Sequence, residues 1–246
     1  VLNRAGQDVI LYRPISNPAS IRLEAHGIAH SENILADNLT DASWILVKPL
    51  VQQFLTKLSF NSYTLGEIAS RIGQGLVTSA DSVYILEDAF ADDKTVTGFS
   101  GALNEIVTLE RAVTHPLMKG ALHMHRYSLL ETDRYVIFPY KESELISASE
   151  FESKYPQTWH YLNRVKKKLE DREKGKMRHS GWYGYVYPKN LDLFAQSKIL
   201  VPSIAAYPAF SYDALGEAYF IGSGGGGGGG YGIRINEDVD LSPYYV

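Results

Sequence analysis

Thr64-Leu-Gly-Glu-Ile-Ala-Ser-Arg-Ile-Gly-Gln-Gly-Leu-Val-Thr-Ser-Ala-Asp-Ser-Val-Tyr-Ile-Leu86 is the most informative stretch of the chain. An apolar, partly alternating segment leads into Gly73-Gln-Gly75, a polar turn follows at residues 78–81, and residues 82–86 have the composition of a strand. Two glycines around one glutamine allow a left-handed backbone or a close approach to another chain segment, and they present an amide side chain. The stretch therefore predicts two strands around a tight loop with a polar tip.

The composition is that of a folded protein. With 246 residues, of which 45% are hydrophobic and 12% aromatic, the chain can bury a core in one large or two small domains, and global disorder is excluded. It has no cysteine, which excludes disulfides and thiolate metal sites and is consistent with a cytoplasmic location. No apolar run is long enough to predict a membrane span. Both ends lack terminal signals, so we expect a piece of a longer protein.

Charge is unevenly distributed along the chain. The net charge is −4, yet residues 154–198 contain eleven basic and four acidic residues, so this region carries +7 and the remainder −11. Such an asymmetry is typical of a surface that binds a nucleic-acid backbone. A solvated helix whose lysines only maintain solubility explains the same pattern, and charge alone leaves both interpretations open.

Local patterns predict an α+β fold with mixed, largely antiparallel strands and one long, amphipathic, basic helix. A helix is expected over residues 48–60, with Pro49 in its first turn. Ser149 and Glu152 form a capping box for the long helix, Pro156 marks a kink or restart, and Gly175 is a plausible stop. Residues 88–101 are acidic and are expected to form an exposed excursion. The predicted strands are 8–13, 134–138, 198–201, 218–221 and 231–235.

A run of glycines between residues 222 and 230 is conspicuous. It is neither a phosphate-binding loop of the Walker A type nor a dinucleotide fingerprint, because no Lys-Ser/Thr and no helix follows it. The simple interpretation is a flexible hairpin connection between the predicted strands 218–221 and 231–235. The functional interpretation is a backbone that packs closely against DNA phosphates.

The order of several motifs resembles the target-recognition domain of adenine-specific DNA methyltransferases, especially the TaqI-type C-terminal specificity domain of type II and type IIG restriction-modification enzymes. The resemblance covers about residues 61–240 and rests on motifs of modest individual specificity. They are the G-x-G-h-h-T-x-x-D pattern of residues 73–81, Lys119-Gly120 followed by Arg126-Tyr127, Arg134 to Tyr140, Trp182-Tyr183 with Pro188-Lys-Asn and Lys198-Ile-Leu-Val-Pro202, and Gly230-Tyr-Gly-Ile233. The acidic residue usual near Leu122 is missing.

This resemblance implies a role in reading duplex DNA. Glutamine is suited to the adenine edge and arginine to the guanine edge, while lysines and arginines neutralise phosphates and aromatic rings stack. Ordinary surface charges, and a buried strand around Trp182, explain the same residues without DNA. The expected DNA-binding residues are Gln74, Thr78, Ser79, Lys119, Arg126, Lys141, Arg164, Lys167, Lys168, Arg172, Lys176, Arg178, Trp182, Tyr183, Lys189 and Lys198. We predict no metal site at His123-x-His125, because no acidic residue or cysteine has suitable spacing.

Catalytic motifs are missing from the sequence. It contains neither the Asn/Asp-Pro-Pro-Tyr/Phe tetrapeptide of adenine methyltransferases nor a Pro-Asp…Glu-x-Lys nuclease pattern. The expectation is a non-catalytic piece of an N6-adenine methyltransferase, with or without endonuclease activity, in which S-adenosylmethionine binds the absent catalytic domain. Residues 1–60 would connect to that domain, and residues 61–246 would recognise double-stranded DNA as a monomer. Alternatives are a protein- or glycan-binding module and the specificity subunit of a type I restriction system.

Overall fold

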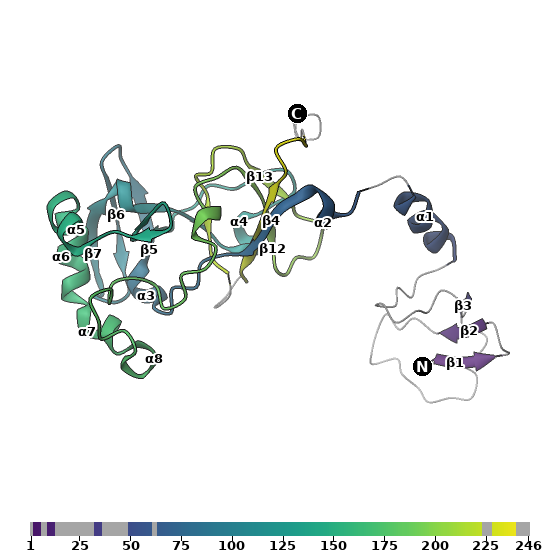
Figure 1. The fold of residues 1–246 in the computed structure, drawn as a ribbon, viewed down its shortest axis with the longest axis horizontal. Coiled ribbons are helices and arrows are strands. Elements are labelled where there is room, and N and C mark those ends of the chain that lie inside the picture. Colours follow the sequence, from purple (N-terminus) through teal and green to yellow (C-terminus); the bar gives the residue numbers. More distant parts are fainter. Residues whose placement is uncertain are drawn as a thin grey trace. The chain divides into compact units, whose positions relative to one another are not determined.

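The computed structural model divides the chain into two compact units, residues 1–64 and residues 65–246 (Figure 1). It describes residues 2–5, 9–12, 32–35, 49–60, 63–222 and 228–239, and the side chains only from residue 50 onward. The smaller unit contains an antiparallel sheet of β1 (Leu2–Ala5), β2 (Val9–Tyr12) and β3 (Glu32–Leu35). Helix α1 (Pro49–Ser59) follows and begins at the proline, which confirms the helix expected there.

A six-stranded sheet forms the centre of the larger unit. Its strand order is β14-β8-β9-β5-β6-β7, and its pairs are antiparallel except for the parallel pair β14–β8. The strands are β5 (Ile85–Ala91), β6 (Thr95–Ser100), β7 (Glu105–Glu110), β8 (Thr114–Met118), β9 (Tyr135–Ile137) and β14 (Tyr219–Phe220). A 3₁₀ turn, η4 (Arg111–Val113), joins β7 to β8.

A four-stranded antiparallel sheet lies beside it, in the order β13-β12-β15-β4. Its strands are β4 (Ala69–Gln74), β12 (Lys198–Pro202), β13 (Ser211–Asp213) and β15 (Gly230–Ile235). Short elements complete the unit: α2 (Leu65–Ile68), α3 (Asp81–Tyr84), α4 (Gly120–His123), η5 (Leu191–Leu193), and the hairpin of β10 (Tyr140–Lys141) and β11 (Glu144–Leu145). The predicted α+β class with largely antiparallel strands is confirmed.

The long basic helix is divided into four consecutive short helices at one end of the unit (Figure 1). They are α5 (Ala148–Lys154), α6 (Pro156–Arg164), α7 (Lys166–Glu170) and α8 (Arg172–Gly175). The restart at Pro156 and the stop at Gly175 are confirmed, the latter with a left-handed φ of 86°. The cap is Ser147 and not Ser149, because the Ser147 hydroxyl accepts the Glu150 amide at 3.2 Å.

Residues 88–101 are not an irregular excursion; they form most of the β5–β6 hairpin. The Asp92 carboxylate accepts the amides of Lys94 and Thr95, which lowers its pKa and fixes the tight turn. Beyond that turn, Val96, Gly98 and Ser100 alternate as buried positions. The acidic residues therefore mark a hairpin tip, and the strand pattern beside them was missed. Residues 82–84, expected to open a strand, belong to the single-turn helix α3 (Asp81–Tyr84) instead.

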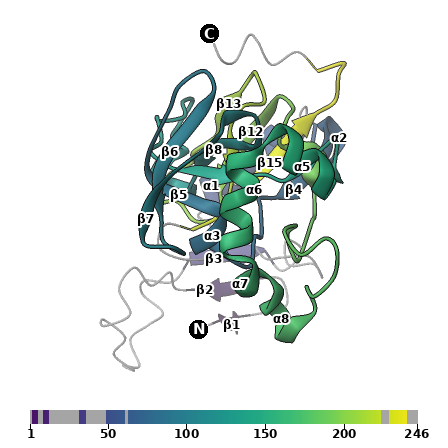
Figure 2. The same ribbon diagram turned by 90° about the vertical axis from the view of Figure 1, so that its left-hand side faces the viewer.

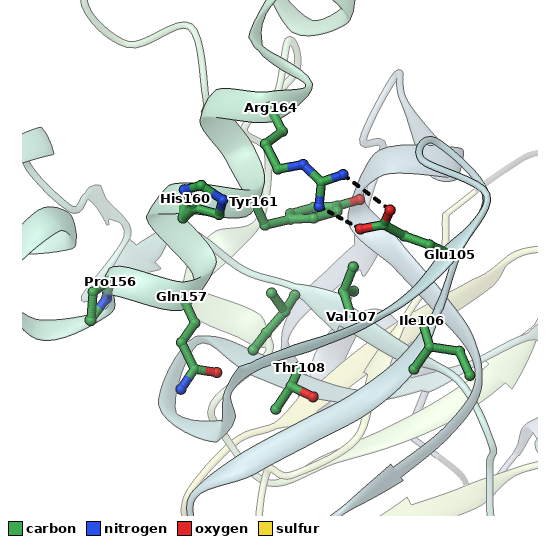
Figure 3. A pocket seen from close by; sticks show the side chains of 10 residues that line it. Glu105, Ile106, Val107, Thr108, Pro156, Gln157, His160, Tyr161 and Arg164 are labelled. Atoms are coloured by element: carbon green, nitrogen blue, oxygen red, sulfur yellow. Dashed lines mark hydrogen bonds and ion pairs between the residues drawn. The ribbon is translucent and has the colours of Figure 1, made fainter.

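Helix α6 runs along the outer strand β7 and is fixed to it at both ends. At the start of α6, the Glu110 carboxylate accepts the amides of Gln157 and Thr158 at 2.8 Å. At its end, the Arg164 guanidinium forms a two-point ion pair with Glu105 (Figure 3). The helix thus covers the edge of the six-stranded sheet, and Figure 2 shows it in front of that sheet.

Candidate nucleic-acid interface

The Gly73-Gln-Gly75 motif lies where the two sheets meet. The Gly75 amide donates to Gly230 O at 3.2 Å, the Leu76 amide to Phe220 O at 2.8 Å, and the Gly222 amide to Leu76 O at 2.8 Å. The Gln74 side chain joins this junction, because its Nε2 donates to Gly222 O at 3.1 Å. The motif therefore fastens both ends of the segment that contains the glycine run.

Close backbone contact explains the glycines of this junction. A Cβ atom on Gly75 would lie 2.5 Å from Phe220 O, and one on Gly222 would lie 2.4 Å from Gly75 O. The hairpin interpretation of the glycine run is wrong, because β14 belongs to the six-stranded sheet and β15 to the four-stranded sheet. Residues 223–227 of the run lie outside the described residues.

The polar turn after the motif, residues 78–81, is stabilised by hydrogen bonds of the buried Thr78 side chain. Thr78 is buried, and its hydroxyl bonds to the Asp81 carboxylate and accepts the Ala80 amide at 3.1 Å. Ser79 is exposed and has a left-handed φ of 55°. Of the two hydroxyls predicted to face DNA, Thr78 thus shapes the turn and Ser79 is the one at the surface.

Arg172 connects this turn to the basic helices. It is only 8% exposed and donates to four backbone carbonyls: Leu169 O (2.8 Å), Thr78 O (3.2 Å), Trp182 O (2.7 Å) and Gly184 O (2.9 Å). Its guanidinium also lies 5.5 Å from the ring centroid of Tyr84, whose pKa is raised by burial. Arg172 is therefore not at the surface, and its charge holds three chain segments together.

The basic segment, defined as residues 164–178, contains eight basic and three acidic residues. Arg164 and Arg178 are exposed but paired, the latter with Asp171 at 2.5 Å, and Lys168 donates to Ala102 O at 2.5 Å. Lys167, Lys174 and Lys176 are exposed, and none forms an ion pair with another described residue. Residues 173–175 have successive positive φ angles, which place Lys174 on a tight bend. These three lysines are the segment's freest cations.

Two predicted aromatic contacts, Trp182 and Tyr183, lie inside the protein. Trp182 is 5% exposed and packs against Trp159 at 5.7 Å between ring centroids, with Lys166 Nζ 5.1 Å from its ring. Tyr183 is 3% exposed and donates to Ile146 O at 2.7 Å. These aromatic residues form core in the structure, as the alternative interpretation held for Trp182.

Lys198 is a structural cation. Its ammonium is 2.5 Å from Asp213 Oδ2 and also donates to Phe194 O and Gln196 O. Asp213 in turn accepts the amides of residues 216, 217 and 218. Burial lowers the pKa of Lys198, against the opposing effect of Asp213. Lys198 is buried at 1% exposure and is occupied with this turn, so it is not placed to meet a phosphate.

The remaining predicted residues are dispersed over the surface. Lys141 lies in β10, Lys189 precedes η5, and both are exposed. Arg126 is exposed, whereas Lys119 is half-buried beside His123, whose Nδ1 accepts the Lys119 amide at 2.9 Å. Burial lowers the pKa of His123. In the described part of the chain, no group of three potential metal ligands comes together.

A shallow hollow of about 460 Å³ lies between α6 and β7 (Figure 3). Gln157 and His160 line it from the helix, Ile106 and Thr108 from the strand, and the Arg164–Glu105 pair closes one end. Arg164, predicted to bind DNA, is thus one wall of this hollow, and its pairing with Glu105 lowers that glutamate's pKa.

Two surface residues near the predicted site, Arg71 and Tyr127, were not among the expected DNA-binding residues. Arg71 of β4 donates to Asn190 Oδ1 at 3.0 Å and lies 3.3 Å from Asp192, which links the opening motif to the segment after Lys189. A single arginine in a predicted strand does not indicate that its partners are Asn190 and Asp192. Tyr127, 59% exposed, was visible in the sequence only as part of the Arg126-Tyr127 motif.

Comparison with known proteins relates the chain to restriction-modification proteins. The chain is 25% identical over 233 residues to the type II restriction enzyme and methyltransferase RM.Eco57I of Escherichia coli. The match covers 88% of this chain and 22% of that protein, so the chain spans about a fifth of the relative's length. No protein-family model matches the chain. Among the described residues, no helix has the length and apolar character needed to cross a membrane.

Proposed function

We propose that this chain is the DNA-recognition part of a restriction-modification protein and binds duplex DNA through the basic segment. The observation that carries the proposal is the similarity of nearly the whole chain to a fifth of a combined restriction enzyme and methyltransferase. Because the chain lacks the Asn/Asp-Pro-Pro-Tyr/Phe tetrapeptide of adenine methyltransferases, we assign it DNA recognition and not methyl transfer. Methyl transfer and S-adenosylmethionine then belong to the rest of the longer protein. We propose that the chain is related to the TaqI-type specificity domain.

Two features of the structure support this role. Lys167, Lys174 and Lys176 present unpaired charge on one segment, as phosphate binding requires. Arg172 fixes that segment to the Thr78–Ser79 turn. The lysines proposed to bind phosphates and the polar turn proposed to meet bases are therefore held at a fixed distance and orientation. Ser79 and the Gln74 amide oxygen are the groups proposed to meet base edges.

The test is the salt dependence of binding to a short mixed-sequence DNA duplex, measured by fluorescence anisotropy. If about five phosphates are neutralised, affinity falls roughly several-hundred-fold between about 50 and 200 mM salt. Replacing Lys167, Lys174 and Lys176 by Gln makes the slope of log affinity against log salt shallower by about 2 to 3.

The control replaces Lys57 and Lys94 by Gln, exposed lysines outside residues 154–198, and is compared with the double replacement of Lys174 and Lys176, which removes the same charge. It is expected to leave the slope nearly unchanged. Equal losses in both variants, or binding that is insensitive to salt, would contradict the proposal and favour a protein- or glycan-binding module.

A further inference from the structure

The turn His125-Arg-Tyr-Ser128 carries an exposed aromatic side chain on an unusual backbone. Tyr127 has a φ of 67°, in the left-handed region that bulky residues rarely adopt, and 59% of it is exposed. Residues held in this region persist where surrounding contacts fix them, and they cluster at ligand-binding sites. Neither the glycine junction, formed by Gly75 and Gly222, nor the basic segment explains why an aromatic ring is exposed at this position.

Hydrogen bonds to a neighbouring strand hold the turn in place. The His125 amide donates to Ser128 O at 3.1 Å, and the Tyr127 amide donates to Phe210 O at 2.9 Å. Ser211 Oγ lies 2.6 Å from His125 O and 2.8 Å from Ser128 O. The backbone is thus fixed from both sides of the tip, and the tyrosine projects from a rigid support.

Arg126 and Tyr127 form a preformed pair at this tip. The Arg126 guanidinium carbon lies 4.8 Å from the ring centroid, and Nη2 donates to the Tyr127 hydroxyl at 2.9 Å. Close by, Phe210 and Tyr207 are 44% and 83% exposed and line a hollow of about 370 Å³. A flat ring beside a cation is the combination that recognises a nucleotide, whose base stacks and whose phosphate is negative.

We propose that Arg126 and Tyr127 form a stacking site for an unstacked nucleobase of bound DNA. The inference rests on the proposed function, because the basic segment would supply most of the affinity for the duplex. Tyr127 supplies the stacking face, and Arg126 backs the ring and reaches the adjoining phosphate. The site therefore distinguishes DNA with an extruded base from fully paired DNA.

The test compares two labelled duplexes, one fully paired and one with a single unpaired aminopurine, whose fluorescence is quenched by stacking. The wild-type chain is expected to bind the second duplex roughly tenfold or more tightly and to quench its fluorescence. Tyr127→Gly removes the ring and suits the left-handed backbone, so folding is retained. This variant is expected to lose the preference and the quenching and to bind paired DNA as before. Tyr127→Phe keeps both.

Phe90→Ala is the control, because Phe90 is a similarly exposed aromatic residue of β5 at 67% exposure. It is expected to behave as wild type. Equal preference and quenching in wild type and Tyr127→Gly, with duplex binding intact, overturns this inference alone and leaves the turn as a surface for a protein partner. Failure of the wild type to bind either duplex overturns the proposed function, and this inference with it.

Discussion

His115 is a mostly buried histidine whose environment keeps it neutral. Its ring stacks on Tyr219 with 4.1 Å between centroids and meets Phe138 edge-on at 6.0 Å. Burial, with a smaller effect of Arg111, lowers its pKa from 6.5 to about 4. Nothing in the sequence around His115 indicates that its ring is buried between aromatic side chains. The nearby histidines were considered only as metal ligands.

The stability of the fold therefore depends on pH through His115. Between about pH 6.5 and 4 the unfolded chain binds a proton that the folded chain excludes, so stability falls as the pH is lowered through this window. The stabilisation is fully present above pH 6.5, and its loss at low pH is about 3 kcal/mol at most. Urea unfolding at several pH values is expected to show a flatter profile for His115→Phe than for wild type. An unchanged profile, identical to that of an exposed-site control such as His160→Gln, would show that the ring is not desolvated.

At the scale of elements, Arg172 joins α7, the turn after β4 and the aromatic segment at residues 182–184. Arg172→Met is expected to lower the free energy of unfolding by about 3 kcal/mol, because four carbonyl oxygens lose a charged donor in the interior. Denaturant unfolding measures this directly. Arg178→Met, at a side chain that is 67% exposed, is expected to change the stability by less than about 1 kcal/mol. Similar losses in both variants would contradict the structural role of Arg172.

Elements with strong local signals could be predicted from sequence. The helix from Pro49, the restart at Pro156 and the strands around residues 135, 199 and 233 each follow from period, proline or β-branched composition. The β5–β6 hairpin was missed because four acidic residues near its turn resemble a loop. Arg172 and Lys198 could not be predicted as buried, since a cation's partners here are carbonyls and a carboxylate contributed by distant segments.

At the scale of the whole molecule, the glycine junction unites the two sheets of the larger unit. Gly75→Ala would place a methyl group 2.5 Å from Phe220 O, and its neighbours at that point are backbone atoms that cannot move aside cheaply. We expect a loss of about 2 to 3 kcal/mol in the free energy of unfolding. Gly101→Ala is the control, because its nearest contact would be 3.7 Å. Equal thermal midpoints for the two variants would show that the junction is not tightly packed.

The arrangement of the sheets could not be predicted from the glycine pattern. A glycine run between two strands usually indicates a hairpin, but the residue before the run, Ile221, donates to Met118 O of β8 and bridges to Leu76, whereas β15 after the run pairs with β12 and β4. Only contacts between residues more than a hundred positions apart, such as Gln74 with Gly222, decide this topology. The same limit applies to the surface. The basic segment could be predicted because its charges are close together in the sequence, whereas the turn that carries Tyr127 is supported by Ser211, which is distant in the sequence.

The helix fixed along β7 has a consequence for synthesis on the ribosome. Glu110 and its partner Gln157 are 47 residues apart, so β7 emerges on the order of seconds before α6 can cover it. During that interval the outer edge of β7, to which α6 is later fixed, is a template for pairing with a neighbouring nascent chain. Chaperone demand should therefore be greatest for chains that end between these two residues.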